Sequence, residues 1–160
     1  MTNVKPKLYL ETTIASYFIA RPSRDLITAA HQQITQEWWE ERRPGYEVFV
    51  SQLVLQEANM GDAQASERRL QALEGFPVLE LNEAAVALAR ALVDQGAVPP
   101  QAVGDALHVA VATVHGMDYL ITWNMKHLAN AVMRNAIATV CLSHGYQPPV
   151  ICTPEELSEG

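Results

Sequence analysis

The feature that most constrains the fold is the alternation of short apolar runs with segments of helical periodicity along the chain. Five of these runs have the length and composition of buried strands. They span residues 8–10, 48–50, 76–81, 119–121 and 150–152. Strands separated by helices favour a parallel sheet with helices on both faces. We therefore expect an α/β protein, a three-layer α/β/α sandwich whose central, mostly parallel sheet has about five strands.

One of the expected helices carries two specific predictions. Ser23 precedes it as a candidate cap, and Pro44-Gly45 ends it. Its apolar residues recur at three- and four-residue steps and are expected to form a single buried stripe of Ile27, Ala30, Ile34 and Trp38. Trp38 and Trp39 occupy adjacent helical positions and cannot both face one core, so we expect one of them in an interface.

Length and composition limit the classes of protein that need to be considered. The chain has 160 residues, of which 49% are hydrophobic and 18% charged, which excludes wholesale disorder and predicts a single domain over 1–160 with a short tail from about 154. A net charge of -7 argues against coating nucleic acid by bulk charge, although a local basic groove remains compatible with it. Cys141 and Cys152 cannot build a disulfide framework, and no zinc spacing is present.

No apolar run reaches membrane-spanning length, and the first seven residues lack the apolar core of a signal peptide. We expect a soluble, cytoplasmic protein that does not contact a membrane.

Four polar residues fall where an α/β sheet presents its ligands, outside the carboxyl ends of strands. Glu11 directly follows the first strand and Asn124 follows the fourth. Asp105 lies in the first turn of an apolar helix, and Glu57 lies on the apolar stripe of another. Carboxylate and carbonyl oxygens are the ligands of hard cations such as Mg²⁺ or Mn²⁺. The set predicts a metal site that acts on a phosphoryl group.

Each of these residues also has an ordinary structural interpretation. Asp105 can be only a helix cap, and Asn124 only a turn residue. Glu57 can reach the surface or pair with an arginine, and Glu11 can be a strand-end acid. The functional interpretation depends on the set, because all four positions converge on one edge of the predicted sheet.

Four segments resemble the PIN-domain family, especially the VapC-like toxins of type II toxin–antitoxin systems. They read Tyr-Leu-Glu-Thr-Thr (9–13), Gln-Glu (56–57), Asp-Ala-Leu-His-Val-Ala (105–110) and Leu-Ile-Thr-Trp-Asn-Met-Lys-His (120–127). The resemblance spans nearly the whole chain, in the expected order. It implies a PIN-like fold and a divalent-metal-dependent endoribonuclease that hydrolyses RNA phosphodiester bonds with Mg²⁺ or Mn²⁺. It also implies a homodimer and inhibition by an antitoxin protein.

The resemblance places Glu11, Glu57, Asp105 and Asn124 in the family's four acidic positions, as catalytic residues and metal ligands. Two of them depart from the family pattern. Glu11 is longer by one methylene than the usual Asp, and Asn124 provides a neutral oxygen where an Asp is frequent. These departures leave open a single-metal nuclease, a slow one, or a catalytically weakened PIN-like module that binds RNA or protein. An unrelated small-molecule enzyme is disfavoured, because nucleotide-binding glycine loops and a nucleophile elbow are missing from the sequence.

Three further residues are supporting candidates. In the family, hydroxyl groups at the positions of Thr12 and Thr13 often lie near the metal or a phosphate. The alternative is that these two residues cap the start of a helix. His108 follows Asp105 by one helical turn and either orients a carboxylate or phosphate or is a buried, hydrogen-bonded histidine.

Cations and one aromatic residue near the predicted site are candidates for RNA contacts. Trp123 is expected either to stack on an unpaired base or to be a partly buried loop aromatic. The cations near the first and fourth acidic positions can hold an RNA backbone, with salt-sensitive binding. They are Lys5, Lys7, Arg21, Arg24, Lys126 and His127.

Overall fold

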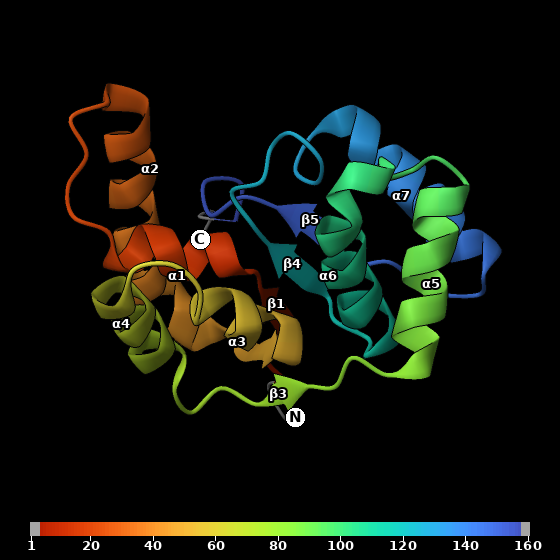
Figure 1. The fold of residues 1–160 in the computed structure, drawn as a ribbon, viewed down its shortest axis with the longest axis horizontal. Helices are drawn as coiled ribbons and strands as arrows, with labels where there is room; N and C mark the ends of the chain where they lie inside the picture. Colours follow the sequence, from red (N-terminus) through yellow and green to blue (C-terminus); the bar gives the residue numbers. More distant parts are fainter. Residues whose placement is uncertain (1–3, 158–160) are drawn as a thin grey trace.

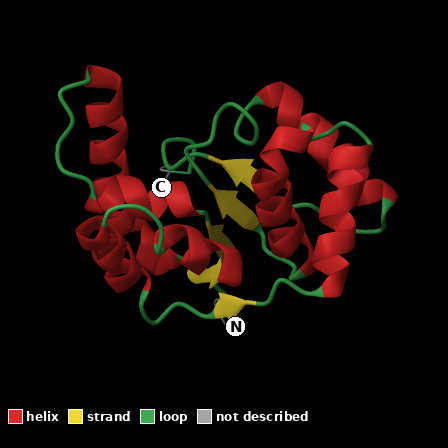
Figure 2. Cartoon of the chain, viewed as in Figure 1, coloured by secondary structure: helices red, strands yellow, loops and turns green. Residues whose placement is uncertain are grey.

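The computed structural model describes residues 4–157 and contains one five-stranded sheet in which every pairing is parallel (Figures 1 and 2). The strands are β1 (Lys7–Leu10), β2 (Glu47–Ser51), β3 (Val78–Leu79), β4 (Tyr119–Ile121) and β5 (Val150–Cys152). All five expected strands are confirmed. The third is shorter than expected because Pro77 has no N–H and the Leu81 N–H bonds to the Gln52 side chain instead of β2.

The order of the strands, β3-β2-β1-β4-β5, places β1 at the centre of the sheet. The chain moves outward from β1 to β2 and β3, and then returns to add β4 and β5 on the other side. The order therefore reverses between β1 and β4, and their carboxyl ends border the crevice in which parallel sheets bind ligands. The Glu11 N–H continues the ladder beyond β1 by donating to the Ile121 carbonyl at 3.1 Å.

Helices cover both faces of the sheet, which confirms the three-layer α/β/α sandwich (Figure 1). One group of helices consists of α1 (Thr12–Ile19), α2 (Leu26–Glu37), α3 (Gln52–Ala58) and α4 (Ala63–Leu73). The other consists of α5 (Glu83–Asp94), α6 (Val103–Val114) and α7 (Ala131–Ser143). The strands between them are fully buried at Leu8, Leu10, Leu120 and Ile121, which is typical of a sheet covered on both sides.

The prediction for α2 is wrong in two respects. Asp25 caps the helix by accepting from the Thr28 N–H at 2.9 Å, whereas Ser23 accepts from the Asp25 N–H. The expected stripe is not buried along its length, because Ile27 is 69% exposed and the first half of α2 projects from the body of the protein (Figure 1). Periodicity identifies an apolar face, but it does not show that the same chain covers that face.

The two adjacent tryptophans are both buried, so the prediction that one lies in an interface is wrong. A π-helical turn, Trp38–Arg42, follows α2 and changes the direction in which successive side chains project. Trp39 stacks on Phe18 with ring centroids 4.2 Å apart, while Trp38 packs against Tyr46. The wider turn therefore sends the two indoles into different aromatic groups of one core.

Side chains cap two segments in the C-terminal region of the described residues. Asn130 caps α7 by accepting from the Met133 N–H at 2.9 Å. Thr153 and Glu156 cap each other reciprocally, and this forms a packed turn where the tail was expected to start. Residues 158–160 of that tail lie outside the described residues. No helix within 4–157 combines the length and the apolar character needed to cross a membrane.

Candidate active site

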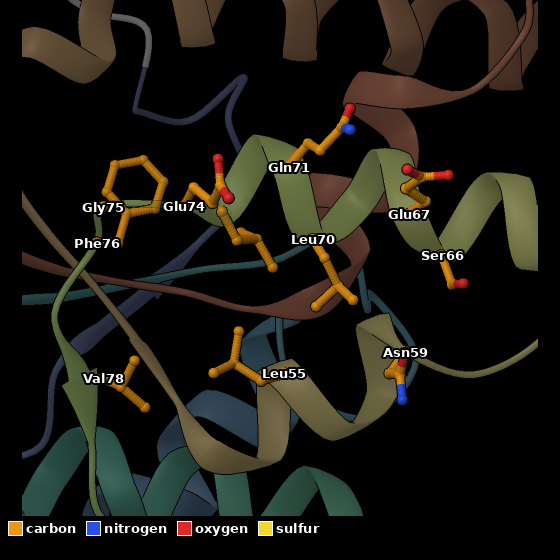
Figure 3. A pocket seen from close by; sticks show the side chains of 11 residues that line it. Leu55, Asn59, Ser66, Glu67, Leu70, Gln71, Glu74, Gly75, Phe76 and Val78 are labelled. Atoms are coloured by element: carbon orange, nitrogen blue, oxygen red, sulfur yellow. The ribbon is translucent and has the colours of Figure 1, made fainter.

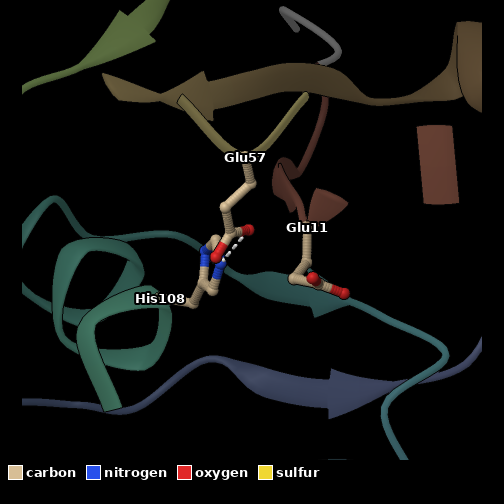
Figure 4. Close-up of side chains that lie close together, drawn as sticks. All are labelled: Glu11, Glu57 and His108. Atoms are coloured by element: carbon tan, nitrogen blue, oxygen red, sulfur yellow. Dashed lines mark hydrogen bonds and ion pairs between the residues drawn. The ribbon is translucent and has the colours of Figure 1, made fainter. Parts of the chain in front are cut away.

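Three elements bring Glu11, Glu57 and His108 together near the carboxyl end of β1 (Figure 4). Glu11 directly follows β1, Glu57 lies in the last turn of α3, and His108 lies in α6. One potential ligand atom from each of these side chains lies within 4.8 Å of the others. Two of the four predicted acidic positions therefore meet as the sequence suggested.

The Glu11 carboxylate is aimed by two hydroxyl groups from opposite sides of the crevice. Its side chain is buried, and one oxygen, Oε1, accepts from Thr13 Oγ1 at 2.5 Å and from Thr122 Oγ1 at 2.6 Å. The Trp123 N–H in turn donates to Thr13 Oγ1, which ties the loop after β4 to the start of α1. The second oxygen of Glu11 has no protein hydrogen bond within residues 4–157, so it is available to a ligand.

The Glu57 carboxylate is held in the same way. Its Oε1 accepts from Thr12 Oγ1 at 2.5 Å and from His108 Nε2 at 2.8 Å, while its other oxygen has no hydrogen bond to the part of the chain that is described. Burial pushes the pKa of Glu57 up, but the hydrogen bond and charge of His108 and the Thr12 hydroxyl outweigh burial and lower the pKa. Glu57 is therefore ionised at neutral pH.

A buried chain of hydrogen bonds supports Glu57 from behind. Tyr9 Oη lies 2.6 Å from His108 Nδ1 and 2.8 Å from Ser51 Oγ, and all three side chains are buried. Burial raises the pKa of Tyr9, so the phenol keeps its proton. Ser51 also caps α3, the helix that carries Glu57, by accepting from the Val54 N–H. Ser51 therefore caps α3 and also begins the series of hydrogen bonds that runs through Tyr9 and His108 to Glu57.

The charge of His108 is set by opposing effects. Its burial disfavours the imidazolium, but the hydrogen bond that it donates to Glu57 and the negative charges of Glu11, Glu57 and Asp105 outweigh burial and raise the pKa of His108. In the neutral and the charged state alike, Nε2–H can donate to the Glu57 carboxylate. The prediction of a buried, hydrogen-bonded histidine is confirmed, and the carboxylate that His108 contacts is that of Glu57 and not that of Asp105.

Asp105 lies beside this cluster without joining it. It occupies the first turn of α6, where Ala102 is the cap residue and no side chain caps the helix, so the interpretation of Asp105 as a cap is wrong. Its half-buried carboxylate has no hydrogen bond or ion pair within 4–157, and it is not among the three residues whose ligand atoms lie within 4.8 Å. Asp105 is thus an unengaged carboxylate one turn before His108.

Asn124, the fourth predicted position, is used by the turn after β4. Its Oδ1 accepts from the His127 N–H at 3.0 Å, and its carbonyl accepts from the Leu128 and Ala129 N–H groups. The structure therefore places Asn124 after β4 as expected, and its side-chain oxygen accepts a hydrogen bond within the turn that follows.

The structure also places Thr12, Thr13 and Trp123. Thr12 and Thr13 do not cap α1, because each donates its hydroxyl hydrogen to a glutamate. Trp123 is 6% exposed, donates from Nε1 to Thr35 Oγ1 at 2.7 Å, and stacks on His31. Its ring is covered on the face that His31 occupies, so the loop-aromatic interpretation is confirmed and stacking on a base is not supported.

Three residues of the site were missed in the sequence. Tyr9, Ser51 and Thr122 all supply hydroxyl groups that position the acids or His108. Tyr9 and Ser51 lie within strands, and Thr122 follows β4 directly. The available signal was a hydroxyl group within or next to an otherwise apolar strand, where burial requires a hydrogen-bond partner.

A large hollow lies elsewhere on the surface, between α3, α4 and β3 (Figure 3). It has a volume of about 610 Å³, and Leu55, Leu70 and Phe76 contribute apolar surface to its wall. None of the predicted site residues lines it. The size of a hollow therefore does not locate the acidic cluster in this protein.

Comparisons with known proteins agree with this geometry. The model of the PIN domain family matches residues 8–127, which contain all four predicted acidic positions. The fold is similar to a chain in the crystal structure of VapBC2 from Rickettsia felis bound to a DNA fragment from their promoter. That similarity has a TM-score of 0.59 at 15% identity and covers 92% of this chain and 98% of the other. No curated protein matches the sequence. Because the family match extends over most of the sequence, the chain belongs to the PIN domain family.

Proposed function

We propose that this protein is a divalent-metal-dependent endoribonuclease that hydrolyses RNA phosphodiester bonds. PIN domains are generally nucleases. The observation that carries the proposal is the common arrangement of Glu11 and Glu57. In each carboxylate one oxygen accepts two protein hydrogen bonds and the other accepts none from residues 4–157. Each glutamate therefore keeps one carboxylate oxygen for a cation, in a cluster whose ligand atoms lie within 4.8 Å of one another.

This donor set fits Mg²⁺ or Mn²⁺. Hard cations take carboxylate oxygens, and Glu11, Glu57 and Asp105 provide three without breaking a hydrogen bond. A bound divalent ion lowers the pKa of a water molecule and neutralises charge on a phosphoryl group. Asn124 contributes an oxygen only when the turn at His127 releases it.

The protein's own residues supply position and charge for the reaction. Thr13 and Thr122 hold Glu11, while Thr12 and His108 hold Glu57, so neither glutamate has to reorganise when substrate binds. Glu57 positions the attacking water. Water attacks the phosphorus and the 3′-oxygen leaves.

The proposal extends to the biological setting. The similarity to a chain of the VapBC2 complex supports an antitoxin protein as partner and a toxin role for this chain. A homodimer and a cytoplasmic location follow from the same resemblance to VapC-like toxins. RNA is the substrate that this resemblance implies.

The test is cleavage of a labelled RNA of mixed structure by the purified full-length protein with Mn²⁺, with Mg²⁺ and with EDTA. We expect cleavage with either ion and none with EDTA. Glu11→Gln is expected to reduce cleavage, because the amide offers a neutral oxygen to the cation. Glu83→Gln on α5 is the matched control and should cleave like the wild type.

Two results would contradict the proposal. Cleavage that persists in EDTA would remove the metal from the mechanism. A folded protein that cuts no RNA with either ion would favour the second candidate function, a weakened PIN-like module that binds RNA or protein. The observation that favours this second candidate is Asn124, a neutral residue whose oxygen already holds a turn.

Asn124→Asp tests whether position 124 contributes to the metal site. The introduced carboxylate can still accept from the His127 N–H, and it adds a negative charge at the end of β4. We expect Mn²⁺ affinity to rise on the order of ten-fold, because affinity in oxygen-ligand sites follows the charge of the ligands. Isothermal titration calorimetry measures this change. Unchanged affinity would show that position 124 does not contribute to the metal site.

A further inference from the structure

We propose that a hollow between α1 and α4 binds the phosphodiester backbone of single-stranded RNA next to the acidic cluster. This inference rests on the proposed nuclease function. The hollow has a volume of about 510 Å³. Three arginines line it, Arg21 after α1 and Arg68 and Arg69 in α4, and we call it the arginine hollow.

Two of the arginines are anchored by backbone carbonyls. An Nη2 hydrogen of Arg68 bonds to the Ile19 carbonyl at the end of α1. Arg69 donates from Nε to the Ala58 carbonyl at 3.0 Å and from Nη2 to the Met60 carbonyl at 2.5 Å. A guanidinium carries five N–H donors, so each group is held in place and keeps donors for a ligand. Because these side chains are already ordered, they lose less conformational entropy when a ligand binds.

The charges of the arginine hollow are not neutralised by the protein. Within residues 4–157, none of the three arginines forms an ion pair with a carboxylate. Asp62 is the one acid in the lining, and it caps α4 by accepting from the Ala65 N–H at 3.0 Å. Three positive charges thus face one negative charge in a chain whose net charge is -7. Such a local excess of positive charge attracts an anion.

Two helices, α1 and α3, contact both the arginine hollow and the acidic cluster or carry its residues. Thr12 at the start of α1 contacts Glu57, and Ile19 at the end of α1 contacts Arg68. Those ends of α1 are roughly 10 Å apart, given a rise of 1.5 Å per residue. The carbonyls that hold Arg69 follow Glu57 by one and three residues. A strand whose phosphate reaches the acids can therefore place a neighbouring phosphate at the arginines.

The chemistry of the lining favours a phosphate backbone over an acidic peptide. The guanidinium fork matches a phosphate with two parallel hydrogen bonds. Among the described residues of the lining, Ile19 is the one large apolar side chain, so a peptide would find little surface in which to anchor its own side chains. Because phosphates carry no base identity, the hollow is expected to bind without sequence preference.

The experiment measures binding of a fluorescent single-stranded RNA by anisotropy in EDTA, so that cleavage does not interfere. The full-length wild type is compared with Arg21→Gln and Arg68→Gln over a range of KCl concentrations. Each variant should lose affinity on the order of five-fold at low salt, and the slope of log K against log salt should fall by about 0.7. Arg90→Gln is the matched control, since Arg90 is exposed on α5 in the other group of helices.

The Arg21→Gln variant keeps the test valid if Arg68→Gln unfolds, because the Arg21 side chain makes no hydrogen bond or ion pair within 4–157. Wild-type slopes in both variants would overturn the inference and leave the nuclease function standing if cleavage persists. A reduced slope in a protein that never cleaves RNA would support the hollow while the proposed function fails. Competition by polyglutamate equal to that by RNA would overturn the preference for phosphate.

Discussion

Replacing Asp105 with asparagine is expected to lower metal-dependent RNA cleavage by about 10³-fold, or about 4 kcal/mol of transition-state stabilisation. The substitution keeps the size of the side chain and removes its charge from the crevice. The Asp105 carboxylate makes no hydrogen bond or ion pair with residues 4–157, so the fold does not depend on it. We therefore expect thermal unfolding and circular dichroism to match the wild type while kcat/KM for a labelled RNA falls with Mn²⁺ and with Mg²⁺.

Asp94→Asn is the matched control for this prediction. Asp94 is exposed at the end of α5 and, like Asp105, has no hydrogen bond within the described part of the chain. The two variants change net charge equally, so non-specific effects on RNA binding should be the same. Cleavage by Asp105→Asn within a factor of about two of the control would remove Asp105 from the reaction.

The sheet could be predicted from local sequence because burial on both faces leaves continuous apolar runs. Residues 8–10 and 119–121 read as strands without any knowledge of their neighbours, and they pair in register at the centre of the sheet. The order of strands was not available from the same signal. It depends on crossover connections, which place β1 between β2 and β4 although these strands are far apart in the chain.

The errors in α2 and in the tryptophan pair have a common physical origin. Helical periodicity assumes a constant turn and a neighbour that covers the apolar face. The π-helical turn at Trp38 breaks the first assumption, and the 69% exposure of Ile27 breaks the second. Neither the π-helical turn nor the lack of a covering neighbour can be recognised from the local amino-acid composition.

Glu11, Glu57 and three of their hydrogen-bond partners, Thr12, Thr13 and His108, were candidates from the sequence, whereas Thr122 and Tyr9 were not. Glu11 could be located because the carboxyl end of a parallel strand is where ligands bind. Its partner Thr122 lies 111 residues away, and Tyr9 lies 99 residues from His108. Contacts at such separation depend on the register of β1 against β4 and on how α6 packs against the sheet.

For Asn124, the place in the fold could be predicted, but the contacts of its side chain could not. A resemblance assigned it to the fourth acidic position, and its place in the fold agrees. Its function in the structure is set by the local turn, since Oδ1 accepts from the His127 N–H three residues later. Asparagine favours such turns for this reason. Position within a motif therefore predicts location, and the partners of the side chain decide what it can do there.

Tyr9→Phe is expected to weaken Mn²⁺ binding by roughly 10- to 100-fold, the range found when a group that orients a metal ligand is lost. The phenol oxygen bonds His108 Nδ1 at 2.6 Å and Ser51 Oγ at 2.8 Å, and phenylalanine keeps the ring without either bond. His108 then loses the partner that holds its ring against Glu57. Two buried polar atoms also lose a partner, which costs roughly 1–3 kcal/mol of folding stability.

Two measurements separate the loss of positioning from a loss of stability. Mn²⁺ affinity is measured by calorimetry well below the unfolding transition, where every variant is folded. Tyr119→Phe is the control, because Tyr119 lies in the adjacent strand β4 and its hydroxyl has no hydrogen bond within residues 4–157. The nitrogen-15 resonances of His108 provide the second measurement, which does not require metal. The Nδ1 resonance should shift in Tyr9→Phe and stay unchanged in Tyr119→Phe.

The combination of results assigns the role of Tyr9 even if the nuclease proposal fails. A shifted Nδ1 resonance with weaker Mn²⁺ binding places Tyr9 behind Glu57 as a positioning residue. A shifted resonance in a protein that binds no Mn²⁺ keeps the hydrogen-bond chain and rejects the metal site. Lower stability with wild-type Mn²⁺ affinity would show that Tyr9 only supports the core, and that Thr12 alone is sufficient to hold the Glu57 carboxylate in place.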